Sequence, residues 1–306
     1  MDLASYGREP ARREYTTWSN PSRCFPALEK SYHHYQLPEA VAELAQRVSA
    51  EFELEGPGRV KNPDGRIQGA WDGEHLSATA ARMEGGQFVI EVSRDPVRVS
   101  EDLAASHLAL LEGAPGWSVV YSLGSYVEPV VVDSAGRPSV LVTRRPSTAF
   151  LHPDSWDGLG GAVPVGLVEP YPTEIAGRLQ REHGVTVRGG LRPLWTYSHR
   201  IANILLPSGY AEIGEADVAN DLPDGAVRPR PVPFVDFARF VETEAPWREW
   251  NYPGFLAVCD TIVAWGFANG RQEFIAVGSQ TAAREADKLA RDPVPVRSVL
   301  QNLGIA

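Results

Sequence analysis

One continuous segment, residues 117–187, limits the possible folds more than any other part of the chain. It contains two valine-rich apolar runs joined by a turn, then a glycine-rich loop, then a stretch with helical spacing that stops at a glycine. Strand and helix patterns in this order predict an α/β fold. The expected elements are strands over Val119–Val132 and Ser139–Thr143, a turn at Asp133–Gly136, a loop over Trp156–Gly166 and a helix over Thr173–His183 ended by Gly184.

Three motifs in this segment resemble the Nudix superfamily. They read VVVDSAGRPSVLVTRR, SWDGLGGAVPVG and TEIAGRLQREHGV: a strand ending in two arginines, a Trp before paired glycines, and the helix of a loop–helix–loop box. The resemblance is good over 117–187, extends to Phe267 and does not cover residues 1–116. It implies a Nudix-like α/β/α sandwich with a mixed sheet over residues 116–268. It also implies a hydrolase-like enzyme that acts on a nucleotide or phosphorylated metabolite.

The box departs from the family pattern where family members bind their metal. The family box ends Arg-Glu-apolar-x-Glu-Glu-x-Gly-apolar, and Glu182 is the carboxylate of this chain that matches it. Arg178 and Arg181 stand where two metal-binding glutamates are expected, and Gly177 stands where the arginine is. The structural positions that match are Leu179, Gly184 and Val185.

These substitutions change what the site is expected to bind. Family members hold Mg²⁺ or Mn²⁺ with several glutamates, because hard cations prefer oxygen ligands, and the metal neutralises a pyrophosphate and helps to activate water. Arginines repel a divalent cation but pair directly with phosphate or carboxylate. One hypothesis is therefore a metal-poor site without a cofactor that binds an anionic group through Arg178 or Arg181. The other is a rebuilt Mg²⁺ site with Glu182, Glu174 and Glu169 as ligands.

The same helix also makes sense without a site. Glu174, Arg178 and Glu182 are spaced i, i+4 and i+8, so opposite charges alternate along one face. Each such pair stabilises an exposed helix by about 0.2–0.5 kcal/mol. Ile175 and Leu179 supply an apolar face that can be buried. The sequence leaves a structural and a functional role open for the arginines.

Other candidates lie near the box in sequence. In the resemblance, Arg144 and Arg145 lie near the substrate's phosphates or base, with surface charges at a strand end as the alternative. Trp156 is expected to pack under the glycine loop or to stack on a ligand, and Gly161, with Gly160, to allow tight turns. His199 follows the box between two strands and is a candidate acid or base beside Glu182 and Glu174.

The rest of the chain is expected to form two further parts. Residues 1–115 are predicted to form a smaller α+β domain with an aromatic-rich arm, which covers the pocket or forms a homodimer interface; 114–116 is the predicted linker. Residues 269–306 are predicted to form a C-terminal strand and helices. The expected elements are a helix from Leu37, a hairpin over Leu76–Val92, a helix from Ser100, strands Leu191–Tyr197 and Ile201–Leu206, a proline-rich loop 223–233, helices Val235–Glu244 and Gly254–Gly266, a strand Phe274–Val277 and helices Ser279–Arg291 and Val296–Leu303.

Composition and charge limit the kinds of partner that the protein is expected to bind. The chain has 306 residues and a net charge of −10, and an acidic chain is poorly suited to tracking a nucleic-acid backbone. We therefore expect a small anionic substrate and no nucleic acid. No run reaches the roughly 18 apolar residues needed to cross a bilayer, so no membrane is expected. The charged N-terminus lacks the apolar core of a secretory signal, so a cytoplasmic location is expected.

Three functions from different classes stay open on the sequence alone. The first is a Nudix-like enzyme with an altered, metal-poor site that acts on a small anionic or nucleotide-like metabolite, with non-hydrolytic chemistry included. The second is a metal-dependent pyrophosphohydrolase of a nucleoside diphosphate derivative. The third is a non-catalytic ligand-sensing module that keeps the box only as a fold, since a fold does not fix a function.

Overall fold

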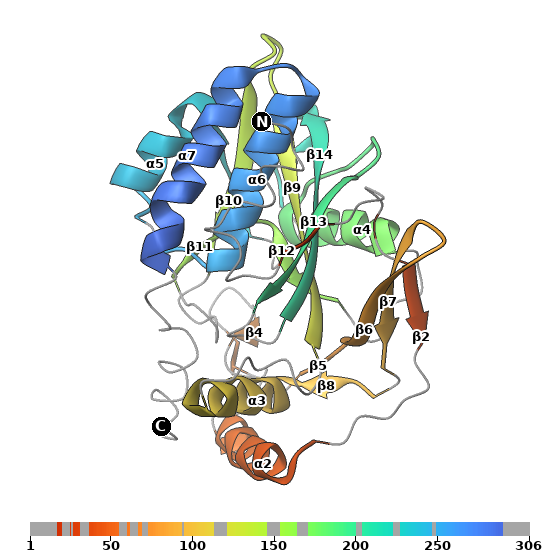
Figure 1. The fold of residues 1–306 in the computed structure, drawn as a ribbon. Helices are drawn as coiled ribbons and strands as arrows, with labels where there is room; N and C mark the ends of the chain where they lie inside the picture. The colour runs from red at the N-terminus through yellow and green to blue at the C-terminus, as the bar shows by residue number, and fades with distance from the viewer. Residues whose placement is uncertain are drawn as a thin grey trace.

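A mixed β-sheet with helices on both faces forms the centre of the computed structural model (Figure 1). The structure describes residues 17–19, 25, 27–30, 37–54, 60–61, 67–68, 73–93, 95–112, 121–145, 154–163, 171–199, 204–222, 227–246 and 249–289. The prediction of an α/β fold with a mixed sheet is confirmed, because β9 runs parallel to β14 and antiparallel to β10. Along its main path the sheet runs β1 (Thr17–Ser19), β13 (Arg192–His199), β14 (Ile204–Gly214), β9 (Tyr121–Val132), β6 (Ser77–Glu84), β7 (Gln87–Val92) and β2 (Ala27–Lys30).

The alternation of side chains along β9 explains why both faces of the sheet are covered. Successive strand residues point to opposite faces. Leu123 and Val127 belong to one buried cluster and Tyr126 and Val130 to another, so the central strand is apolar on both sides. Four shorter segments complete the sheet beside β9: β10 (Pro138–Arg144), β11 (Trp156–Asp157), β12 (Gly160–Ala162) and β15 (Arg230–Pro233).

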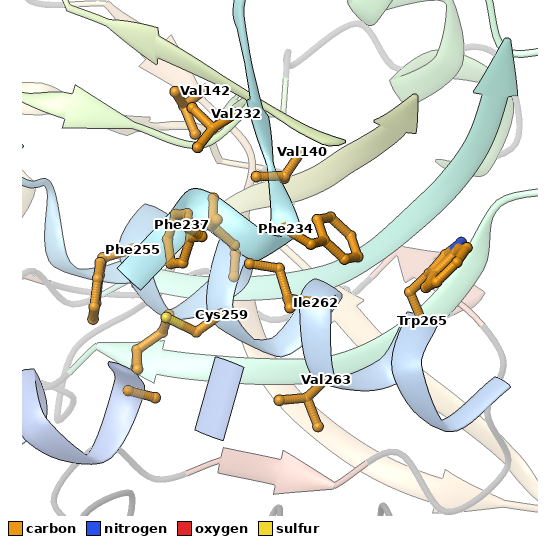
Figure 2. Packing of buried hydrophobic residues seen from close by; sticks show 14 of the residues in the cluster. Val140, Val142, Val232, Phe234, Phe237, Phe255, Cys259, Ile262, Val263 and Trp265 are labelled. Atoms are coloured by element: carbon orange, nitrogen blue, oxygen red, sulfur yellow. The ribbon is translucent and has the colours of Figure 1, made fainter. Parts of the chain in front are cut away.

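Three helices cover one face of the sheet: α5 (Phe237–Thr243), α6 (Tyr252–Ala268) and α7 (Gln272–Leu289). The predicted helices over Val235–Glu244 and Gly254–Gly266 are confirmed by α5 and α6. Figure 2 shows Phe234 and Phe237 between the valines of β10 and β15 and the stretch of α6 around Cys259 and Ile262. These side chains are almost fully buried. Their cluster is the larger of the two apolar clusters found among the described residues.

The opposite face carries α4 (Tyr171–His183), which confirms the helix predicted for the box. Ile175 of α4 shares an apolar cluster with Leu123 of β9 and with Phe88 of the β6–β7 hairpin. β6 also continues the sheet, since Ser77 pairs with Ser122 of β9. Helices α2 (Glu39–Leu54) and α3 (Val99–Glu112) contact each other, and the short strands β3 (Val60–Lys61) with β4 (Ile67–Gln68) and β5 (Glu74–His75) with β8 (Val97–Arg98) form two separate pairs. The domain boundary predicted near residue 115 falls outside the described residues and stays a prediction.

Two sequence expectations for the C-terminal half are wrong. The strand predicted at Phe274–Val277 lies inside α7, whose buried residues Phe274, Gly278 and Thr281 recur at helical spacing. A Cβ at Gly278 would lie 2.7 Å from the carbonyl oxygen of Cys259, so the glycine lets α7 approach α6 closely.

The second error is the loop expected over 223–233. Its end forms β15, which pairs antiparallel with β10, Pro231 opposite Leu141 and Pro233 opposite Ser139. Proline lacks an N–H, and edge strands tolerate it because one row of their donors needs no partner in the sheet. The helix predicted at Val296–Leu303 lies outside the described residues. Among the described residues, no helix is long and apolar enough to span a membrane.

Candidate functional site

The glycine-rich segment, residues 156–162, lies between β9 and β10 where these two strands separate; this gap is called the fork. These strands pair through Val130–Val132 and Pro138–Val140 only. Beyond that point β11 pairs with β10 and β12 pairs with β9, so the segment fills the space between them. The backbone N–H of Val127 also donates to the carbonyl oxygen of Leu159 (3.1 Å). Gly158 therefore marks the point where the segment crosses from one strand to the other.

Both paired glycines are closely packed, and at Gly160 the backbone oxygen of Ser125 leaves no room for a side chain. A Cβ at Gly160 would lie 2.4 Å from the ring of Tyr126, and one at Gly161 would lie 2.3 Å from a terminal guanidinium nitrogen of Arg178. Neither glycine has a positive φ. The expectation that they allow tight turns is therefore wrong, because both lie in a regular strand and their lack of a side chain makes room for neighbours.

Helix α4 is anchored to the sheet beside this segment. Tyr171, Ile175 and Leu179 are buried at helical spacing, and the Tyr171 hydroxyl donates to the carbonyl oxygen of Gly124 (2.9 Å). Burial raises the pKa of Tyr171, so the hydroxyl stays protonated as a donor. Gly184 ends the helix with a φ of 65°, the left-handed conformation in which glycine is favoured.

The structure brings Arg178 and Gly161, both candidates from the sequence, into contact. The Arg178 side chain is only 13% exposed, and its Nε lies 3.1 Å from Oε1 of Glu182, which is 50% exposed. Arg181 differs, since its side chain is 61% exposed and its Nη2 lies 2.6 Å from Oε1 of Glu174. Each arginine of α4 therefore pairs with one of the two candidate carboxylates, and Arg178 is the one held against the glycine-rich segment.

Three further candidates, Arg144, Arg145 and Trp156, contact residues outside α4. The Arg144 guanidinium lies 5.7 Å from the centroid of Trp156, and its Nε donates to the carbonyl oxygen of Asp154 (3.0 Å). Trp156 is buried against Phe240 and Trp250 under α5 and α6. Arg145 forms a 3.1 Å ion pair with Asp157. These side chains belong to the α5–α6 side of the sheet, whereas Arg178 belongs to the α4 side.

A buried polar cluster that the sequence analysis missed lies on the α6 side of the fork. Asp157, only 3% exposed, accepts hydrogen bonds from the Tyr126 hydroxyl (3.0 Å), Arg145 (3.1 Å) and the Asn251 amide (3.0 Å). The Asn251 amide also donates to the Tyr126 oxygen (2.8 Å). Burial raises the pKa of Asp157, and Arg145 offsets part of that increase. The cluster ties the start of α6 to β9 and β11.

Glu128 is a second buried acid beside this cluster. Its side chain is fully buried, and both carboxyl oxygens lie 3.1 Å from the backbone N–H of Leu159. Burial raises the pKa of Glu128 well above its usual range, and the nearby Asp157 carboxylate adds to the effect. The signal that could have revealed it is a single acidic residue inside the apolar run of β9.

The remaining candidates are placed only in part. His199 is the last residue of β13, paired with Ile204, and its side chain lies outside the described residues. Glu169 also lies outside them. Among the side chains that the structure describes, no three His, Cys, Asp or Glu residues are grouped as a metal site would require. The set of Glu182, Glu174 and Glu169 proposed from the sequence as Mg²⁺ ligands thus stays a prediction.

Comparison with known proteins finds likeness in structure only. No protein-family model matches the sequence, and no curated protein does. Among solved structures, the NUDIX domain of Shewanella oneidensis NrtR complexed with ADP ribose is 14% identical with a TM-score of 0.33, over 44% of this chain and 86% of that one. The MutT protein of Methanosarcina mazei Go1 is 14% identical with a TM-score of 0.32, over 56% of this chain and 96% of that one. The C-terminal domain of mouse MUTYH is 19% identical with a TM-score of 0.30, over 38% of this chain and 75% of that one.

Proposed function

We propose that this chain is a Nudix-like enzyme that binds a small anionic, nucleotide-like metabolite directly through Arg178, without requiring a divalent metal. The observation that carries the proposal is the contact between the Arg178 guanidinium and Gly161. It places a permanent cation between the glycine-rich segment and the box helix. In the family pattern that the sequence resembles, carboxylates of this helix hold the metal.

The environment of Arg178 suits an exchangeable anion. A guanidinium offers up to five N–H donors in a planar fork that matches phosphate or carboxylate oxygens. Its partner Glu182 is half exposed, so an incoming anion can replace that carboxylate without leaving a buried charge unpaired. Arg178 itself is largely buried, and an ion pair there is screened less by salt than one on the surface.

The charges on α4 favour this reading over a rebuilt Mg²⁺ site. Glu174 and Glu182 are both paired with arginines, and a divalent ion would have to displace those cations and then remain beside them. Hard cations bind where several oxygen ligands are free to converge. Metal-dependent pyrophosphate hydrolysis therefore needs ligands beyond these two carboxylates.

Replacing Arg178 by glutamine tests the proposal. A hydrogen bond to a charged group contributes about 1.5–3 kcal/mol, so Arg178→Gln should weaken binding of ADP-ribose about tenfold to a hundredfold. Arg181→Gln should have the smaller effect, because the Arg181 side chain is exposed and pairs with Glu174. Calorimetric titration in the presence of EDTA gives the affinities directly.

Arg239→Gln on α5 is the matched control, since Arg239 is exposed and pairs only with Asp236 among the contacts described. The Arg239→Gln variant should bind ADP-ribose with the same affinity as the unmodified protein. Equal affinities for Arg178→Gln and the control would contradict the proposal. Incubating the protein with ADP-ribose and following the phosphorus resonances separates an enzyme, which converts the probe, from a ligand-sensing module, which only binds it.

A further inference from the structure

The fork between β9 and β10 is held together by a side chain as well as by backbone hydrogen bonds. The backbone ladder from β12 to β9 ends where Val127 donates to the carbonyl oxygen of Leu159. The next donor, the N–H of Leu159 itself, goes to the carboxyl group of Glu128. Glu128 therefore completes the attachment of the glycine-rich segment to β9 at the point where the segment turns toward β10.

Gly158 lies directly against this carboxyl group. A Cβ at Gly158 would lie 1.9 Å from Oε1 of Glu128, so only glycine fits where the segment crosses the fork. The Glu128 side chain is fully buried, and its described hydrogen-bond donor is a neutral backbone N–H. A carboxylate buried with a single neutral donor is unfavourable, and such a group keeps its proton instead.

The groups that face Glu128 make its ionisation harder. Asp157 of β11 is a second buried acid, and Tyr126 of β9 is a buried phenol; Arg145, at the end of β10, is a cation but is already paired with Asp157. On α6, the titratable side chains that the structure describes are Cys259 and Asp260, both fully buried. Ionised Glu128 would thus be repelled by Asp157, while Arg145 is already paired with Asp157.

We propose that Glu128, in its protonated form, is the positioning residue of the candidate anion site: it fixes the glycine-rich segment in the fork and thereby holds Gly161 against Arg178. This inference rests on the proposed function, because it concerns how the same site is kept in shape. Loss of the proton leaves a buried charge beside Asp157, which outweighs the stronger hydrogen bond from Leu159; the segment then opens toward water more readily, and the anion affinity falls. Glu128 does not touch the anion itself, since it lies on the α6 side of the sheet.

Glu128→Gln separates this role from a merely structural one. Glutamine has the shape of the protonated acid, keeps an acceptor for the N–H of Leu159 and cannot ionise. The variant should keep the segment ordered at every pH. Glu128→Ala, which removes the acceptor, should loosen it at every pH.

The experiment measures amide hydrogen exchange of residues 156–163 and ADP-ribose affinity in parallel between about pH 6 and pH 9, after correction for intrinsic exchange. In the unmodified protein, protection should fall by up to about tenfold per pH unit as the pH rises, because the opened segment releases one proton that the closed segment holds, and it should level off above the raised pKa of the buried Glu128. The affinity should fall once the opened form is populated. In Glu128→Gln both should stay flat. Glu215→Gln, an exposed substitution of the same chemistry, should behave like the unmodified protein.

The two readouts assign a failure to its cause. A pH profile of protection that is the same with and without Glu128→Gln would overturn the role of Glu128, whatever the ligand does. The link to Arg178 would be overturned if protection in Glu128→Gln did not change with pH but its ADP-ribose affinity still fell as in the unmodified protein. If ADP-ribose binds to none of these proteins at any pH while protection follows Glu128, the proposed function fails, and so does the positioning role that rests on it.

Discussion

Gly254→Ala is expected to lower the free energy of unfolding by about 2–4 kcal/mol. A Cβ at this position, in the first turn of α6, would lie 1.9 Å from Oδ1 of Asp157 and 2.7 Å from the backbone nitrogen of Gly158. Overpacking a well-filled site costs about 1–3 kcal/mol, and losing a buried hydrogen bond to a charged group adds about as much. Alanine favours the helix by only about 1 kcal/mol, so the clash decides the sign.

Urea denaturation of the Gly254→Ala variant and of the unmodified protein at neutral pH measures this difference in the free energy of unfolding. Gly190→Ala is the matched control, because a Cβ at Gly190 has nothing within 4 Å and its φ is not positive. It should change stability by no more than about 0.5 kcal/mol. If Gly254→Ala is as stable as this control, Asp157 does not lie against the start of α6 as described.

Replacing both arginines of α4 by glutamate should create a metal site. In the double variant Arg178→Glu/Arg181→Glu, Glu174 and Glu182 lose the cations that now pair with them. Four carboxylates would then lie within the last three turns of one helix, which suits a hard divalent cation. We expect Mn²⁺ affinity to rise at least about tenfold over the unmodified protein, which corresponds to about 1.4 kcal/mol.

The control for this variant must change the net charge equally. Arg188→Glu/Arg239→Glu does so at two exposed positions, one after α4 and one on α5. It should leave Mn²⁺ affinity unchanged, as measured by calorimetry on metal-stripped protein. A similar gain in both double variants would mean that overall charge, and not the placement of carboxylates on α4, controls metal binding.

The elements around the box follow from local pattern. The strands β9 and β10, the helix α4 and its glycine stop could be predicted because apolar spacing and a left-handed glycine act within a few residues. The strand expected at Phe274–Val277 is wrong because a short apolar run carries no period of its own. What decides it is the packing of Phe274 against Trp265 at the end of α6 and against Phe234, which is far away in sequence.

The site was predictable only where its residues are close in sequence. The pairing of Arg178 with Glu182 is an i, i+4 contact and follows from spacing. The contact of Arg178 with Gly161 depends on how the loop returns to β9, which no local pattern in the sequence predicts. The buried acids were missed because they owe their environment to Asn251 and to a backbone donor, neither of which local pattern connects to them.

Titrating Mg²⁺ into the metal-stripped protein, with and without ADP-ribose, tests whether the protein binds an anion without a divalent metal. We expect ADP-ribose to bind equally well in EDTA and in Mg²⁺, and Mg²⁺ to bind more weakly than about 1 mM with and without ADP-ribose. Mg²⁺ binding tighter than that value, strengthened by ADP-ribose, would contradict a metal-poor site. It would instead assign the chain a rebuilt metal site with carboxylates such as Glu174 and Glu182 as ligands.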